Sequence, residues 1–229
     1  MHKLFKDRLH AGKLLAQRLL AYARRPEVIV LALPRGGVPL GAVIARALAV
    51  PLDVLLVRKL GVPGYPECAI GAIAGDGQCL LNTGQVKLLG LPLDAIEAEA
   101  RHEQDEIARR ELRYREGRPA PQLEGKIVIL VDDGIATGAT MQMAIWLARQ
   151  AKAAKIIVAV PVAPNEVFRT LNAEVDALVC LRTPSPFLSV GQCYQDFEQV
   201  SDEQVAQLLR QTRQRAAPQP AGSAAGSAP

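Results

Sequence analysis

Short, uninterrupted runs of apolar, β-prone residues constrain the fold of this chain most. They cover Val28–Leu33, Ile127–Val131 and Ile156–Val160, and each leads through a turn into a segment with helical spacing. Strands that are apolar at every position are buried on both faces, which is typical of a parallel sheet covered by helices. The sequence therefore predicts an α/β, three-layer fold with a mainly parallel central sheet flanked by helices, plus a small hood.

Further elements follow from the same spacing rules. Apolar residues on either side of Gly75-Asp76-Gly77 predict a β-hairpin that joins Ile70–Ile73 to Leu80–Leu81. Additional strands are expected at Leu52–Val57 and Val175–Leu181, and helices at Leu4–Ala23, Val38–Leu48, Leu93–Arg118, Gly138–Gln150, Asn165–Asn172 and Asp202–Arg213. We expect one domain, residues 1–215, and a disordered tail, residues 216–229, made almost only of Ala, Gly, Ser and Pro.

The hood is expected from two segments, residues 60–118 and 182–199. The first contains a Gly/Pro-rich loop, Leu60–Glu67, and the highly charged helix Leu93–Arg118. Acidic and basic residues recur there at i,i+4, as in Glu97 and Arg101, which supports an exposed helix. Its apolar stripe is thin, so we predict loose docking, either as a solvated surface helix or as a movable cover.

Composition narrows the class of protein. No apolar run approaches the roughly 20 residues that span a bilayer, and early charges interrupt any signal-peptide core, so we expect a cytoplasmic protein without membrane contact. The net charge of +4 is spread over helices that also carry acids, which argues against nucleic acid as a partner. The four cysteines form no Cys-x-x-Cys pair and the three histidines are scattered, so a zinc cage is not expected.

The unusual chemistry follows the strand Ile127–Val131. Its next nine residues are Asp132, Asp133, Gly134, Ile135, Ala136, Thr137, Gly138, Ala139 and Thr140. Two carboxylates after a buried strand are costly in a core but suit a cleft, where they can accept hydrogen bonds from hydroxyl groups. The small residues that follow expose backbone N–H groups at the start of a helix, where an anion binds well. One loop thus offers acceptors for a diol and donors for a phosphate, although an acidic turn before a capped helix is the plainer alternative.

A second strand end carries Pro34, Arg35, Gly36 and Gly37. Glycines let a backbone approach a ligand closely, and arginine can donate two hydrogen bonds to a phosphate. The spacing does not match the Gly-x-Gly-x-x-Gly of dinucleotide sites, and the Gly-Lys-Ser/Thr of a P-loop is missing. By itself this turn is weak support for an anion site.

Together these residues resemble the type I phosphoribosyltransferase family. Its signature of four apolar residues, two acids, two aliphatic residues and a small, hydroxyl-rich end is matched from Val128 to Thr140, except that Gly134 stands where an aliphatic residue is usual. Arg58-Lys59-Leu60-Gly61, Ala69–Ile73 and Phe187–Ser201 further resemble uncharacterised bacterial phosphoribosyltransferase-domain proteins, some of them fused to hydrolase domains. The resemblance covers roughly residues 25–182.

The resemblance implies roles for these residues. Asp132 and Asp133 would bind the ribose hydroxyls of phosphoribosyl pyrophosphate, and residues 136–140 its 5-phosphate. Arg35 would act with Gly36 and Gly37 on the pyrophosphate, in this family often after a cis peptide bond. Arg58 and Lys59 would lie beside the leaving group. Mg²⁺ would be held through substrate and water near the two aspartates, without direct protein ligands. The implied catalytic residues are Asp132, Asp133 and Arg35, and the implied substrate-binding residues are Gly36, Gly37, Arg58, Lys59, Gly134, Ile135, Ala136, Thr137, Gly138, Ala139 and Thr140.

The acceptor is the open question. Three aromatic residues, Phe187, Tyr194 and Phe197, lie in the second hood segment and could stack on a nucleobase, or could simply pin the C-terminal segment to the core. We predict transfer of phosphoribose to a nitrogenous acceptor, with a nucleobase as the leading candidate and a homodimer as a possible assembly. The alternatives are a non-catalytic regulatory module that binds the same ligand, and a phosphohydrolase that uses an aspartate as nucleophile.

Overall fold

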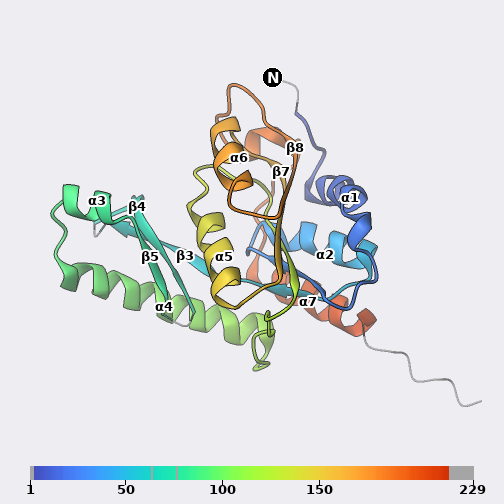
Figure 1. Ribbon diagram of the computed structural model, residues 1–229, viewed down its shortest axis with the longest axis horizontal. Coiled ribbons are helices and arrows are strands. Elements are labelled where there is room, and N and C mark those ends of the chain that lie inside the picture. The colour runs from blue at the N-terminus through green and yellow to red at the C-terminus, as the bar shows by residue number, and fades with distance from the viewer. Residues whose placement is uncertain (1–2, 63, 76, 217–229) are drawn as a thin grey trace, which may run out of the picture.

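The structure, a computed structural model, describes residues 3–62, 64–75 and 77–216 (Figure 1). Its centre is a five-stranded sheet in the order β2-β1-β6-β7-β8, and all neighbouring strands are parallel. The strands are β1 Val28–Ala32, β2 Leu52–Val54, β6 Ile127–Val131, β7 Lys155–Val162 and β8 Ala177–Arg182. The predicted α/β, three-layer fold is confirmed.

Helices cover both faces of this sheet, as the apolar runs required. One face packs on α1 Arg8–Arg18, α2 Gly37–Leu48 and α7 Asp202–Ala216, and the other on α5 Ala139–Gln150 and α6 Asn165–Asn172. Within β6, Ile129 and Val131 belong to the first core and Val128 and Leu130 to the second. Because successive side chains of a strand point to opposite faces, every position of β6 is buried.

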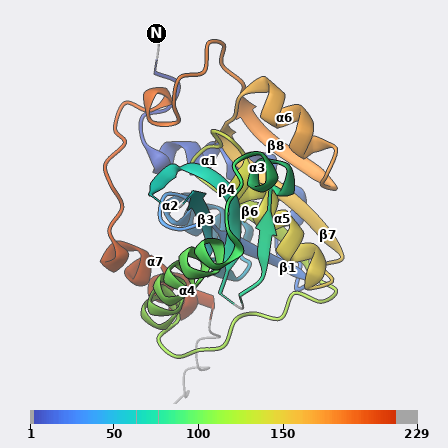
Figure 2. The same ribbon diagram turned by 90° about the vertical axis from the view of Figure 1, so that its left-hand side faces the viewer.

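A second, antiparallel sheet forms an arm, residues 57–115. It contains β3 Val57–Val62, β4 Tyr65–Ala74 and β5 Cys79–Leu81, followed by α3 Thr83–Leu88 and α4 Leu93–Arg115. The arm projects from the body of the molecule (Figure 1), and Figure 2 shows it end-on, with α4 beside α7. The hairpin predicted between Ile70–Ile73 and Leu80–Leu81 is confirmed by the β4–β5 register.

Two sequence predictions are wrong in the arm. Leu52–Val57 is not one strand, because β2 ends at Val54 and the chain then leaves the central sheet. Leu60–Glu67 is not a long loop, since β3 and β4 pair across it. Apolar packing explains both differences. Leu60 is fully buried in the main core, which is the core on the side of α1, α2 and α7. Val57 packs on a small cluster that includes Met143 of α5. Their burial outweighs the turn-forming tendency of the nearby Gly and Pro residues.

The prediction of a loosely docked α4 is wrong for the C-terminal half of that helix. Arg115 is only 6% exposed, and it donates to the Asp53 carboxylate at 3.1 Å and to the carbonyl oxygen of Val54 at 2.8 Å. Tyr114 is fully buried and donates to Asp202 at 2.5 Å. At the other end of the helix Leu93 is 67% exposed. The helix is therefore anchored at one end to β2 and α7.

The N-terminal segment pairs with residues 193–196 through backbone hydrogen bonds. Leu4 and Phe5 donate backbone hydrogen bonds to Cys193, and Gln195 and Asp196 donate back to Phe5 and Lys6, at 2.8–3.0 Å. The receiving segment, residues 183–199, is called the C-terminal strap below. Helix α7 follows it and ends at Ala216, one residue inside the predicted tail, whose residues 217–229 lie outside the described residues. In the described part of the chain, no helix has the length and apolar character to cross a bilayer.

Candidate active site

Two loops meet at the carboxyl ends of β1 and β6: the arginine loop, residues 34–37, and the acid loop, residues 132–140. They are adjacent because Ala32 pairs with Val131 in parallel register, and Leu33 N donates to Val131 O at 2.8 Å. Carboxyl strand ends are where open α/β sheets bind ligands. The peptide bond before Arg35 is cis, as the resemblance implied.

Glycines make this contact between the loops possible. A Cβ atom on Gly36 would lie 2.0 Å from Oδ2 of Asp133, and one on Gly37 would lie 2.5 Å from the carbonyl oxygen of Val131. Neither position can hold a side chain while the acid loop stays in place. The Arg-Gly-Gly turn thus has a structural reason that does not depend on a ligand.

The two aspartates are half-buried beside this turn. Burial raises the pKa of Asp132 well above its ordinary value, and the neighbouring Asp133 carboxylate adds to this effect. Burial also raises the pKa of Asp133, while the guanidinium of Arg8 acts against that shift. Two neighbouring carboxylates with little access to water accept hydrogen bonds strongly from hydroxyl groups, or bind a hydrated cation.

The end of the acid loop has the character of an anion site. Ile135 N donates to Val162 O at 2.9 Å, which fixes the loop to β7, and Ala136 and Thr137 then become exposed. Among the residues that the structure describes, none accepts a hydrogen bond from the N–H groups of residues 136–140. These amides lead into the first turn of α5, where the helix dipole favours negative charge.

Gly134, the position that departs from the family signature, is explained by its neighbours. Its φ is +159°, and a Cβ atom there would lie 2.5 Å from Val190 Cγ1 and 2.8 Å from Val162 Cγ2. An aliphatic residue would push the strap off the acid loop. The glycine therefore lets the strap pack directly on the loop, which the family pattern alone did not indicate.

The basic residues separate into two groups. Arg35 lies in the arginine loop, half-buried, with Nη1 3.9 Å from Oδ1 of Asp202. Arg58 and Lys59 lie instead on β3 in the arm sheet. The Arg58 guanidinium forms a two-point ion pair with the buried Glu103 of α4, and this hydrogen bonding raises its pKa. In this conformation Arg58 joins α4 to β3 rather than facing a leaving group, and Lys59 is exposed.

Of the three aromatic candidates, Tyr194 is a core residue. It is 1% exposed, and its hydroxyl donates to the backbone carbonyl of Asp133 at 2.5 Å. Its ring offers no free face to an acceptor, so the alternative that it pins the C-terminal segment is correct for this residue. Phe187 is half-buried against the main core, and Phe197 is 37% exposed with its ring 5.0 Å from that of Tyr194. An acceptor role for these two stays a prediction.

Sequence reasoning missed Arg8. Its Nε and Nη2 lie 2.9 and 2.8 Å from Oδ2 of Asp133, although 125 residues separate the two along the chain. Nothing near Arg8 in the sequence indicates this contact, because the first residue of a helix looks like any other surface position. The acid pair was the available signal, because two adjacent carboxylates after a buried strand favour a positive charge nearby. The sequence did not show which basic residue supplies it.

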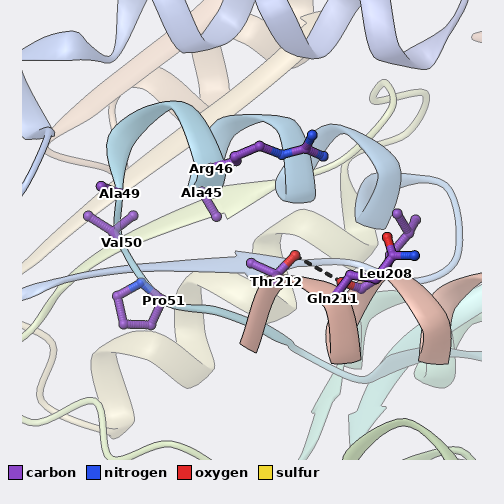
Figure 3. A pocket seen from close by; sticks show the side chains of 8 residues that line it. All are labelled: Ala45, Arg46, Ala49, Val50, Pro51, Leu208, Gln211 and Thr212. Carbon is purple, nitrogen blue, oxygen red and sulfur yellow. Dashed lines mark hydrogen bonds between the residues drawn. The ribbon is translucent and has the colours of Figure 1, made fainter. Parts of the chain in front are cut away.

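Of two further pockets, one lies away from both loops and the other touches the acid loop at Ala139. The pocket in Figure 3, about 430 Å³, lies between Ala45–Pro51 and residues 208–212 of α7. Since α2 begins in the arginine loop at Gly37, this pocket is at the opposite end of the helix. A smaller pocket of about 260 Å³ lies between the β4–β5 hairpin and the first turn of α5, where Ala139 and Gln142 line it. In the described residues, no group of three or more His, Cys, Asp or Glu is placed to hold a metal ion.

Residues 5–175 match the sequence model of the phosphoribosyl transferase domain, so the match spans most of the chain and both loops. The chain belongs to the phosphoribosyltransferase family. Two Mycobacterium tuberculosis proteins provisionally named as phosphoribosyl transferases, Rv0571c and MT0597, are each 47% identical over 207 residues, or 90% of this chain. The match covers 46% of those proteins, so this phosphoribosyltransferase chain spans about half the length of the curated relatives.

A solved structure resembles most of this chain. The crystal structure of the protein TT1426 from Thermus thermophilus is 41% identical in sequence, with a TM-score of 0.77. The alignment covers 90% of this chain and 98% of that one. Most of this fold therefore also occurs in the Thermus thermophilus protein.

Proposed function

We propose that this phosphoribosyltransferase uses phosphoribosyl pyrophosphate and Mg²⁺ to transfer phosphoribose to a nitrogenous acceptor, with a nucleobase as the leading candidate. The observation that carries the proposal is the acid loop. Its two carboxylates can accept hydrogen bonds from the ribose hydroxyls, and the N–H groups of residues 136–140 can bind the 5-phosphate. Such a reaction would belong to nucleotide metabolism, and the cytoplasmic location stays a prediction.

The reaction follows from where charge develops. As the bond from C1 to the pyrophosphate lengthens, positive charge grows on the ribose ring and negative charge on the leaving group. Asp132 and Asp133 would hold the ring by its hydroxyls and favour the positive charge, while Arg35 would bind the leaving group. The residues fit Mg²⁺, since oxygen ligands, water and diphosphate are what this ion prefers, and the bound ion would neutralise the departing pyrophosphate.

The test is the release of pyrophosphate. Wild-type protein, labelled phosphoribosyl pyrophosphate, Mg²⁺ and a panel of purine and pyrimidine bases should give a nucleoside monophosphate with one of the bases. Asp133→Asn should lower the rate by about two or more orders of magnitude, because it removes charge stabilisation in the transition state. Asp105→Asn, which neutralises an exposed carboxylate on α4, is the matched control and should leave the rate unchanged. Full activity in Asp133→Asn rules the proposal out.

One observation favours a second candidate, a regulatory module that binds the same ligand without turnover. Asp133 is already paired with Arg8, so its carboxylate is partly engaged before any ligand arrives. Calorimetric titration separates the two functions: tight, Mg²⁺-dependent binding with no product across the whole base panel supports the module. Release of inorganic phosphate from simple monoesters, measured in the same samples, would indicate a phosphohydrolase instead.

A further inference from the structure

Arg8 makes three kinds of contact, and each has a defined partner. Its Nε donates to Oδ2 of Asp133 at 2.9 Å, and its Nη2 lies 2.8 Å from the same oxygen in an ion pair. Its Nη1 donates to the carbonyl oxygen of Glu198 at 2.6 Å. The guanidinium carbon lies 3.9 Å from the centroid of the Phe197 ring, a cation–π arrangement. With an exposed side-chain fraction of 12%, the guanidinium is held on all these sides.

These contacts depend on the pairing of the N-terminal segment with the strap. The backbone bonds between residues 4–6 and 193–196 set the N-terminal segment beside the strap, and Asp7 caps α1 by accepting from His10 N at 2.7 Å. Arg8 is the first residue of α1, so the cap and the backbone pairing together fix where its side chain begins. The strap supplies the ring and the carbonyl that hold its far end.

Asp133 is consequently held at two points. Arg8 holds its side chain through Oδ2, and Tyr194 holds its main chain through the carbonyl oxygen. Oδ1 of Asp133 receives no hydrogen bond from any other residue that the structure describes. The arrangement uses one carboxylate oxygen for the protein and leaves the other for a ligand. An ion pair with only a structural role would be stronger if the guanidinium contacted both carboxylate oxygens.

We propose that Arg8 is a positioning residue for the active site: it fixes the Asp133 carboxylate so that Oδ1 accepts a hydrogen bond from a ribose hydroxyl of the ligand. This role rests on the proposed function, because it assumes a phosphoribosyl ligand. It assigns part of the active site to the N-terminal segment. Arg8 acts on the ligand through Asp133, and its positive charge opposes the rise in pKa that burial causes in that carboxylate.

The experiment compares Arg8→Gln, Arg8→Lys and Asp133→Asn, with the double variant Arg8→Gln/Asp133→Asn. Lys13→Gln, an exposed position on the same helix, is the matched control for loss of one positive charge. Binding of phosphoribosyl pyrophosphate and of inorganic pyrophosphate is measured by calorimetry with Mg²⁺. We expect Arg8→Gln to weaken phosphoribosyl pyrophosphate by at least about tenfold, since a hydrogen bond to a charged group is worth that much. Pyrophosphate, which lacks the ribose, should bind as to the wild type.

Two comparisons separate positioning from a general structural effect. If Arg8 acts through Asp133, the double variant binds no more weakly than Asp133→Asn alone. Arg8→Lys, which keeps a donor and the charge, should recover part of the affinity. Equal losses for both ligands, or additive losses in the double variant, overturn the proposal. Tighter binding of phosphoribosyl pyrophosphate to Arg8→Gln also overturns it, because Arg8 would then compete with the ligand.

A measurement without ligand keeps this inference separate from the proposed function. Protein labelled with ¹³C at the Asp carboxyl carbons gives one resonance for Asp133, identified by its loss in Asp133→Asn. That resonance should move in Arg8→Gln and stay in place in Lys13→Gln. If the wild type fails to bind phosphoribosyl pyrophosphate while the resonance moves as expected, the proposed ligand is wrong and Arg8 still positions Asp133. An unmoved resonance removes the positioning role, whatever the ligand.

Discussion

At the residue scale, the acid loop is shaped by three positions that have no room for a side chain. Gly36 and Gly37 bring the arginine loop against it, and Gly134 lets Val190 of the strap pack on it. Each glycine touches a different neighbour, so each fixes a different side of the loop. These glycines act by leaving space for neighbouring atoms that a side chain would displace. A sum of favourable contacts does not include this effect.

Gly36→Ala tests this exclusion. The new Cβ would lie 2.0 Å from Oδ2 of Asp133, so the carboxylate must move. We expect the free energy of unfolding to fall by about 1–3 kcal/mol, the usual cost of overpacking, and ligand binding to be lost. Urea denaturation and calorimetry measure the two effects. Gly84→Ala is the control, because its Cβ would be 3.5 Å from the nearest atom, and unchanged binding in both variants would contradict the steric argument.

A pH prediction follows from Asp132. Burial raises its pKa in the folded protein above the ordinary value of 3.8, so the folded state holds this proton more tightly than the unfolded chain does. The free energy of unfolding should therefore decrease as pH rises from about 3.8 through the raised pKa. Asp132→Asn should be more stable than the wild type at pH 7, with a flatter pH profile in urea denaturation. A less stable Asp132→Asn would show that the carboxylate is stabilised by contacts that outweigh its burial.

The sequence predicted the residues with local patterns and missed those with distant partners. The acid loop was visible because strand, acids and small residues are contiguous. Arg8 and the role of Tyr194 were not, because their contacts to Asp133 cross 125 and 61 residues and leave no spacing pattern. The Gly134 departure was visible, but its reason lies in Val190, which sequence reasoning had no means to place beside it.

At the element scale, strands of the central sheet were predictable and the arm was less so. Continuous apolar runs identify β1, β6 and β7 because both faces of each strand are covered. Strand β3 carries Arg58 and Lys59 and lies partly exposed in a small sheet, so its sequence looks like a loop. Its position depends on an ion pair with α4 and on the packing of Leu60, both of which are tertiary contacts.

The anchoring of α4 can be tested at Arg115. Removing this buried side chain leaves the Asp53 carboxylate and the Val54 carbonyl without their partner. We expect Arg115→Ala to lower the free energy of unfolding by about 3–5 kcal/mol, because a broken buried pair leaves an uncompensated charge. Arg101→Ala, on the exposed part of the same helix, should change it by no more than about 0.5 kcal/mol. Comparable losses in the two variants would show that α4 is not anchored at this end.

At the scale of the whole molecule, the N-terminal segment and the strap close around the loops of the central sheet. The N-terminal segment and the strap pair through their backbones, and Phe5, 3% exposed, packs its ring 5.5 Å from that of Tyr194. The family match ends at residue 175, so the strap lies beyond it. Tyr194, which lies outside the matched segment, thus holds the main chain of Asp133, which lies within it.

Phe5→Ala should show this dependence. We expect a loss of about 3–5 kcal/mol in the free energy of unfolding, typical of a buried phenylalanine, and weaker ligand binding although Phe5 lies outside both loops. Leu4→Ala, at a partly exposed neighbouring position, should have a much smaller effect on both. Denaturation and calorimetry give the two values. Normal binding in a destabilised Phe5→Ala protein would mean that the acid loop holds its shape without the paired ends.

The pairing of the N-terminal segment with the strap also implies an order of events during synthesis. Arg8 leaves the ribosome well before Asp133, but the ring and carbonyl that hold Arg8 belong to residues 197 and 198, which are made later still. All five strands of the central sheet precede the strap in the sequence, so each of them is synthesised before that point. A nascent chain that stops short of the strap would then possess the sheet and both loops, yet would lack the ordered carboxylate. Competence for the ligand would therefore arise only after the strap has been synthesised.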